Sequence, residues 1–210
     1  MKKAFTLLVL IVTSTMAFAQ GTVVLGNQTG LVKQWTGVSV PKGGGYVELI
    51  AAPVGTALLN PLFDGTGGVN YNSLAGFLAA NPGWALPSNS AGAGTPALIG
   101  LAPGIFAGGV YTINNIGAGA NAEYFLIGWF GNATTADAAI AGWFAGQNMF
   151  NASAIAITAT GDPLATPPGV PVNLKSTFGG MTLTVPIPEP SSFALAGLGL
   201  AALLVLCWRR

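Results

Sequence analysis

Acidic side chains are the main candidates for acid–base chemistry in the central part of this chain. The 210 residues contain no histidine, and the single cysteine, Cys207, lies in an apolar C-terminal run. The commonest general base, the commonest transition-metal ligand and any thiol nucleophile are therefore missing between the two ends. The acids of this central part are Glu48, Asp64, Glu123, Asp137 and Asp162.

These acids form no recognisable catalytic or metal-binding pattern. A glycosidase needs two carboxylates that flank one bond, but no two of these acids are neighbours in the sequence. Asp64-Gly65-Thr66-Gly67 differs from the Asp-Thr-Gly of aspartic proteases by the inserted Gly65, and a loop turn explains it better. We expect all five side chains to be solvated at the surface. The central part is therefore expected to hold no catalytic, cofactor-binding or metal-binding residue, and not to be an enzyme.

Four of the five tryptophans lie in the central part of the chain and offer a different chemistry, because an indole ring can stack on a sugar ring. Trp129 lies in an almost wholly apolar run and should be buried, whereas Trp84 follows Pro82-Gly83 and is expected to be the more exposed. Trp35 and Trp143 complete the set. Core packing is the more general use of such residues. Binding of an exopolysaccharide is therefore kept as an alternative function.

Composition limits the remaining function classes. Only 6% of the residues are charged. Between residues 20 and 185, three lysines against five acids leave a net charge of −2. Binding to nucleic acid through phosphate neutralisation is excluded by this balance. The same stretch has the size of one domain.

The N-terminus has the three parts of a secretory signal. Lys2-Lys3 provide the basic region and Ala4–Met16 the apolar region. Ala17-Phe18-Ala19 provides the small-x-small pattern that signal peptidase reads. We therefore predict a signal peptide over residues 1–19, with Ala17 and Ala19 at the signal-peptidase site.

The C-terminus reads as a stalk followed by a membrane segment. Pro188 and Pro190 hold Glu189 in an extended backbone, so residues 186–192 should form a stiff stalk. The apolar residues 193–208 would span about 24 Å as a helix, close to the thickness of a hydrocarbon core. Arg209 and Arg210 should stop translocation and stay in the cytoplasm as a basic tail, residues 209–210. The domain at 20–185 would then lie outside the cytoplasm.

This tail resembles the PEP-CTERM sorting signal of Gram-negative bacteria. The resemblance rests on Pro188-Glu189-Pro190-Ser191, the glycine-containing apolar run and Arg209-Arg210, in this order at the extreme C-terminus. It implies recognition by an exosortase-like membrane peptidase or transpeptidase. Pro188, Glu189 and Pro190 would be the recognition element. It also implies release or transfer to the cell surface or the extracellular matrix, often in biofilm-forming bacteria.

Segments rich in β-formers, separated by turn residues, predict the fold of the domain. An antiparallel β-sandwich with one or two short helices fits this pattern best, with a transmembrane helix added at the C-terminus. The expected strands are 22–25, 31–40, 46–51, 110–116, 123–130, 154–160 and 181–185. The expected helices are 72–80 and 134–146, the second with Thr135 as its N-cap.

The sequence thus predicts an exported cell-envelope or matrix protein, sorted through its C-terminal signal, with a non-enzymatic domain. The first alternative is a carbohydrate-binding module for exopolysaccharide. The second is a glycan-active enzyme that uses the scattered carboxylates.

Overall fold

The computed structural model describes residues 20–28, 30–64, 68–186 and 208. Within these residues the chain forms mainly β-strands and two short helices, so the predicted mainly β class is confirmed. No helix in this part of the chain is long and apolar enough to cross a membrane. The predicted signal peptide 1–19 and, Trp208 apart, the predicted helix 193–208 lie outside the described residues.

The first sheet is built on a long antiparallel ladder between β1 (Gln20–Gly26) and β7 (Ala107–Gly117), in which Val23 lies opposite Tyr111. Three short strands extend this ladder in the order β11-β1-β7-β4-β5. They are β4 (Ser88–Asn89), β5 (Gly92–Ala93) and β11 (Val172–Asn173). Two of them, β4 and β5, lie between the predicted strands 46–51 and 110–116, where no strand was expected.

The second sheet is centred on the antiparallel pair β3 (Gly45–Pro53) and β8 (Asn121–Phe130), in which Glu48 lies opposite Ile127. The outer edge of β8 pairs first with β10 (Ala156–Ala159) and then with β9 (Met149–Ala152). The short β6 (Ala97–Leu98) pairs with β3 at the other edge. β8 is therefore central, which explains its nearly continuous apolar sequence.

The sequence predicted antiparallel pairing throughout, but two pairs of strands are parallel. β11 runs parallel to β1, and β12 (Met181–Thr182) runs parallel to β2 (Val32–Lys33) in a separate ladder. Parallel partners need a long connection, and here most of the chain lies between them. Strands of two residues carry no periodicity from which a direction could be read.

The two larger sheets share one hydrophobic core. The first sheet contributes Val23, Leu25, Tyr111 and Ile113, and the second contributes Val47, Leu49, Tyr124 and Leu126. Side chains alternate between the two faces of a strand, so the neighbours of these residues on β3 and β8 point the other way. The sheets are therefore two layers that face each other across this core.

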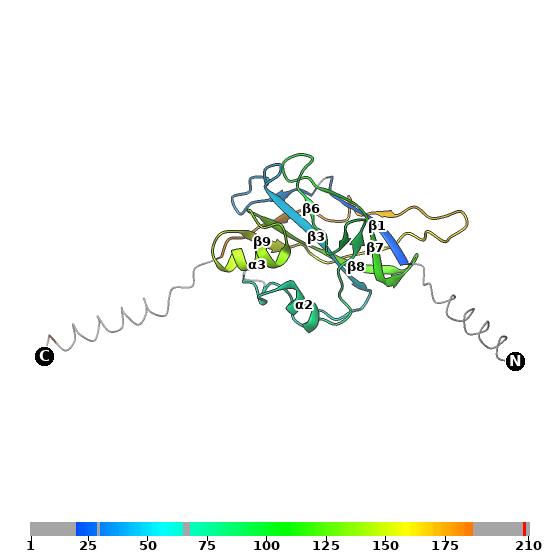
Figure 1. Ribbon diagram of the computed structural model, residues 1–210, viewed down its shortest axis with the longest axis horizontal. Helices are drawn as coiled ribbons and strands as arrows, with labels where there is room; N and C mark the ends of the chain where they lie inside the picture. Colours follow the sequence, from blue (N-terminus) through cyan, green and yellow to red (C-terminus); the bar gives the residue numbers. More distant parts are fainter. Residues whose placement is uncertain (1–19, 29, 65–67, 187–207, 209–210) are drawn as a thin grey trace.

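A second core lies on the opposite face of the second sheet. There Ile50, Phe125, Ile127 and Trp129 pack with residues of α2 (Leu74–Ala80) and α3 (Ala136–Phe144). Figure 1 shows both helices beside the strands β3 and β8. The helices thus form a partial third layer, which positions the loop between β8 and α3.

Local hydrogen bonds fix where the two helices begin. Ser73 Oγ accepts from the backbone N–H of Gly76 at 3.1 Å. Thr135 Oγ1 accepts from the N–H of Ala138 at 3.3 Å, which confirms the predicted N-cap. Asp137 then joins the two helices, because its Oδ1 accepts from the N–H of Leu74 at 2.6 Å. The first turn of α3 therefore caps the first turn of α2.

Two predicted strands are wrong over most of their length, since 181–185 is a strand only at Met181–Thr182 and 31–40 is the longer error. Residues 31–40 were expected to form a single strand, but only Val32–Lys33 is one. The chain then turns back, and the N–H of Gln34 donates to the carbonyl of Val38 at 2.7 Å. Gly37 makes this turn possible with a φ of 82°, which disfavours any side chain. The alternating valines 32, 38 and 40 had suggested one continuous register.

Candidate functional site

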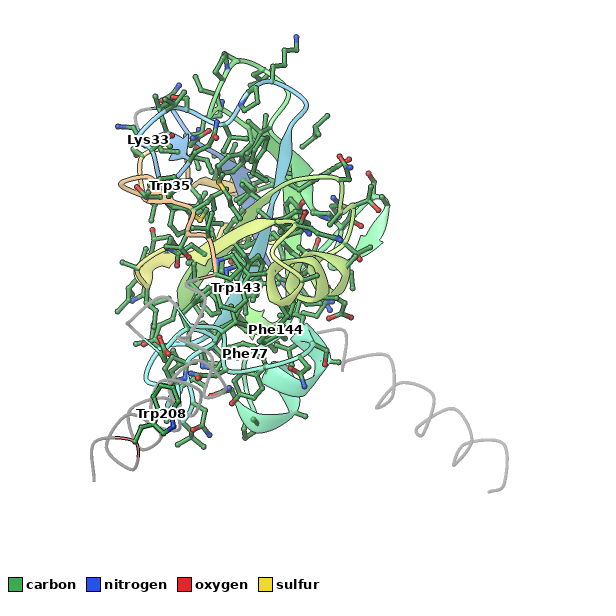
Figure 2. All side chains as sticks on the ribbon, turned by 90° about the vertical axis from the view of Figure 1, so that its left-hand side faces the viewer. Lys33, Trp35, Phe77, Trp143, Phe144 and Trp208 are labelled. Carbon is green, nitrogen blue, oxygen red and sulfur yellow. The ribbon has the colours of Figure 1, made fainter. Side chains whose placement is uncertain are left out.

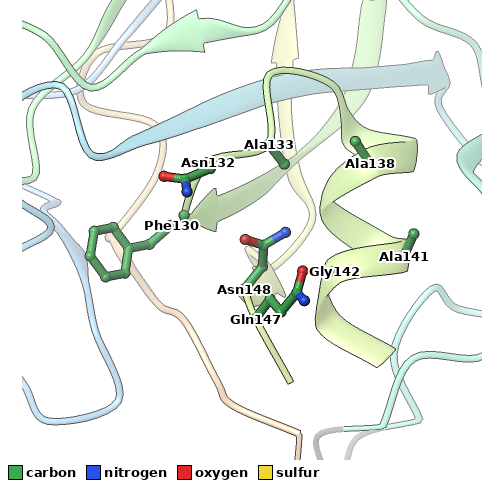
Figure 3. Close-up of a pocket in the computed structure, with 9 residues that line it drawn as sticks. Phe130, Asn132, Ala133, Ala138, Ala141, Gly142, Gln147 and Asn148 are labelled. Atoms are coloured by element: carbon green, nitrogen blue, oxygen red, sulfur yellow. The ribbon is translucent and has the colours of Figure 1, made fainter. Parts of the chain in front are cut away.

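An open pocket lies between the end of β8, helix α3 and the start of β9. We call it the amide pocket, because three carboxamide side chains, Asn132, Gln147 and Asn148, are its polar lining groups. Its volume is about 880 Å³, within the range of about 300–1,000 Å³ typical of small-ligand sites. The other lining residues are Phe130, Gly131, Ala133, Ala138, Ala141 and Gly142. Figure 3 shows the three amides between the loop after β8 and the helix.

Hydrogen bonds hold both walls of the amide pocket in place. On one wall, the indole Nε1–H of Trp129 donates to the carbonyl of Ala133 at 2.8 Å and anchors the loop. On the other, the N–H groups of Gln147 and Asn148 both donate to the carbonyl of Gly142, at 2.7 and 3.2 Å. The turn after α3 is thereby folded back against its own helix. The pocket is therefore built on backbone that is fixed at both sides.

Asn148 lies at the base of this pocket between two glycines. Its side chain is only 8% exposed. A Cβ placed on Gly131 would lie 2.0 Å from its Oδ1, and a Cβ on Gly142 would lie 2.1 Å from its Nδ2. Gly131 also has a φ of 141°, outside the range that other residues favour. Only glycine at both positions leaves room for the amide where it is.

The lining determines which chemistry the pocket can perform. Carboxamides donate and accept hydrogen bonds without carrying charge, and none of the lining residues is titratable. The pocket therefore has no general base, general acid or ionic nucleophile of its own. Its polar lining groups are uncharged hydrogen-bond donors and acceptors.

The five acids of the sequence prediction lie at scattered positions, and four of them bind backbone N–H groups. Glu123 Oε1 accepts from Gly55 at 3.0 Å, and Asp137 binds Leu74 as described above. Asp64 and Asp162 each accept from an N–H close in sequence, Gly68 and Leu164, both at 2.9 Å. These four side chains fix turns and helix ends.

Glu48 was expected at the surface, and this prediction is wrong. Its side chain is 3% exposed and lies on the face of β3 that carries the second core. The backbone of Gly94 covers it so closely that a Cβ there would lie 2.9 Å from Glu48 Oε1. Burial, reinforced by the nearby Asp137 carboxylate, raises the pKa of Glu48 from 4.5 to about 8.

The carboxylate of Asp137 lies close enough to Glu48 to contribute to its raised pKa. A pair of neighbouring carboxylates is also what a glycosidase site requires. Neither residue lines the amide pocket, however. Glu48 is also covered by the backbone of Gly94.

The tryptophans are mostly core residues. Trp129 is fully buried as predicted, and Trp143 is nearly so. Trp84 was expected to be exposed but is only 4% exposed, because it packs against Phe125 in the second core. Trp35 is 60% exposed, and Figure 2 places it beside Lys33, away from Trp143 and Phe144. No row of exposed tryptophans exists in the described part of the chain.

The sequence analysis missed the amide pocket. Its one signal was Gly142, a glycine inside an otherwise good helical pattern, which commonly marks a close packing requirement. Asn148 gave no sign, because its burial depends on the fold of the turn before β9.

The predicted sorting and processing residues all lie outside the described residues. They are Ala17, Ala19, Pro188, Glu189, Pro190, Arg209 and Arg210.

Comparison with known proteins identifies the C-terminus. Residues 186–210 match the family model described as the PEP-CTERM protein-sorting motif. This motif implies export, membrane-associated sorting in Gram-negative bacteria and an exosortase as processing partner. Neither a curated protein nor a solved structure matches the chain significantly. The family match thus covers the sorting motif alone, and the function of the domain has to be inferred from its geometry.

Proposed function

Because the chain ends in a PEP-CTERM sorting motif, we propose that it is a non-enzymatic protein of the cell surface or extracellular matrix, delivered there by an exosortase. The match over residues 186–210 is the observation that carries this proposal. Signal peptidase would remove residues 1–19, and residues 193–208 would hold the protein in the inner membrane until the exosortase acts. We interpret the two facing sheets as a β-sandwich displayed outside the cytoplasm.

The chemistry of the domain supports a role without catalysis. Four of its acids are engaged with backbone N–H groups, and the fifth, Glu48, is covered. A glycan-active enzyme is the weakest candidate for this reason. Robust hydrolysis of a polysaccharide by the purified protein, abolished by Glu48→Gln, would overturn this part of the proposal.

A second candidate function is binding of an exopolysaccharide. The tryptophan surface that first suggested it is absent from the described residues, since Trp84, Trp129 and Trp143 are buried. The amide pocket supports it instead, because carboxamides suit the hydroxyl groups of a sugar.

Replacing Pro188, Glu189 and Pro190 by alanine is expected to block processing of the C-terminus. Proline disfavours a helical backbone, so replacing Pro188 and Pro190 by alanine removes the feature from which the sequence predicts a stiff, extended stalk. In the native host, immunoblots of membrane and medium fractions should show the triple variant accumulating in the inner membrane.

Val170→Ala provides the control, since this residue is exposed and far from the tail in sequence. It should be distributed like the unaltered protein. If the triple variant also reached the medium or the cell surface in normal amounts, recognition through Pro188-Glu189-Pro190 would be disproved.

A further inference from the structure

We propose that the amide pocket is a binding site for a neutral glycan, with Asn148, Asn132 and Gln147 as the residues that bind its hydroxyl groups. This inference deepens the second function proposed above and rests on it. It assigns the site and the class of sugar.

The buried asparagines of this fold provide the first argument. Asn27 uses its side chain in three hydrogen bonds, donating to Gly30 and Gly104 and accepting from Phe106. Asn81 likewise makes three, two with Asn60 and one with Phe77. Buried amides are thus fully paired elsewhere in the described chain, as is usual in proteins.

Asn148 departs from this pattern. Its side chain makes one long hydrogen bond, from Nδ2 to the carbonyl of Ala139 at 3.4 Å, and within the described residues its Oδ1 accepts none. This oxygen is not fully enclosed by the protein, so a molecule in the pocket can reach it. The pairing that the protein lacks is available from the pocket, because Asn148 is one of its lining residues.

The other two amides of the pocket, Asn132 and Gln147, lie at its rim and also have side-chain atoms without a partner among the residues that the structure describes. Neither Asn132 nor Gln147 makes a side-chain hydrogen bond within the described part of the chain, and both are exposed. Figure 3 shows their side chains on either side of Asn148. Three amides, each with hydrogen-bonding atoms that no described residue pairs, thus line one pocket from two segments of the chain.

Small residues leave the space that a sugar would occupy. Gly131, Ala133, Ala138, Ala141 and Gly142 carry at most a methyl group. Phe130 offers no stacking surface here, because its ring packs against the first core and close to Gly44.

Charge decides which glycans fit. The lining has no cation to pair with a uronate or sulfate group, and the domain itself carries a net charge of −2. An anionic polymer would bring like charge to this surface without compensation. A neutral polysaccharide supplies many hydroxyl donors and acceptors and meets no repulsion.

Calorimetric titration of the full-length chain tests this proposal. The chain is kept in a detergent without a sugar headgroup, such as an amine oxide, so that the detergent does not compete. The probes are neutral hexasaccharides of glucose, mannose and N-acetylglucosamine, together with a polyuronate hexasaccharide. We expect at least one neutral probe to bind with a Kd below about 1 mM, and the polyuronate to bind at least about tenfold more weakly.

Variants locate the binding in the pocket. Asn148→Ala and Asn132→Ala should each weaken it about fivefold, the loss expected for one hydrogen bond. Asn132 is exposed, so its replacement remains informative if Asn148→Ala folds poorly. Ala138→Leu should abolish binding by filling the space, whereas Ala75→Leu, the same change in an exposed first turn of α2, should leave it unaltered.

Two results would overturn the proposal. One is that no neutral probe binds, in which case water alone pairs with Asn148. The other is that a neutral probe binds equally well to Ala138→Leu and Asn132→Ala, which would place the sugar elsewhere. Neither result would contradict the proposed sorting, because C-terminal processing of every variant is measured separately by intact mass.

Discussion

We expect the free energy of unfolding to fall strongly as the pH rises from 4.5 to about 8, because of Glu48. Replacing Glu48 by glutamine should abolish this fall. Glu48 is buried beneath Gly94, with the carboxylate of Asp137 and the phenol of Tyr111 as the titratable groups near it. Glutamine has nearly the same shape but no proton to lose in this range.

The direction follows from the proton balance. Below pH 4.5 the Glu48 carboxyl is protonated in both the folded and the unfolded protein. Between pH 4.5 and about 8 the folded protein keeps a proton that the unfolded chain has released, so the free energy of unfolding falls as the pH rises. Above about pH 8 both states are ionised and the loss is complete, amounting to roughly 5 kcal/mol at most.

Urea denaturation of the processed protein at intervals between pH 4 and 9 measures this effect. The free energy of unfolding of Glu48→Gln minus that of the unaltered protein should rise by about 1.4 kcal/mol per pH unit between pH 4.5 and about 8. Glu123→Gln, in the same sheet but not fully buried, controls for the loss of a carboxylate as such. Parallel pH profiles for Glu48→Gln and the unaltered protein would show that Glu48 is not buried as described.

Truncating Trp129 to alanine is expected to cost about 3–5 kcal/mol of stability, as for other large aromatic residues in cores. Trp129 is fully buried, stacks on Tyr46 at a centroid distance of 5.9 Å and also packs against Phe150. Its indole N–H additionally anchors the loop of the amide pocket through Ala133.

The chain offers a matched control in Trp35. Because Trp35 is 60% exposed, its replacement by alanine should change the free energy of unfolding by less than about 0.5 kcal/mol. Denaturant midpoints of the two variants give the comparison directly. Equal destabilisation by both changes would contradict the assignment of Trp129 to the second core.

The long elements of the fold could be predicted because their sequences carry a strong pattern. The strands β3 and β8 and the helix α3 with its cap at Thr135 were all expected close to their observed positions. The almost wholly apolar sequence of β8 agrees with its burial on both faces. In each case the local pattern and the tertiary environment favour the same structure.

The remaining features depend on contacts between distant segments. Glu48 looked like a surface acid, because nothing near it in sequence indicates that Gly94 will cover it. Trp84 follows a proline and a glycine, yet it is buried because its ring packs against Phe125 of β8. The amide pocket needs Gly131, Gly142 and Asn148 to meet, and their spacing along the chain has no recognisable motif.

The central claim is that the protein is exported and then processed at its C-terminus, and intact mass measures this most directly. The protein is recovered from cells and medium of its native host, with and without the exosortase. We expect a mass that lacks residues 1–19 and the segment after Pro188-Glu189-Pro190, with any added mass revealing attachment to another molecule. In the strain without the exosortase, the C-terminal segment should be retained. A mass that includes Arg209-Arg210 in both strains would contradict sorting and leave an ordinary membrane-anchored protein.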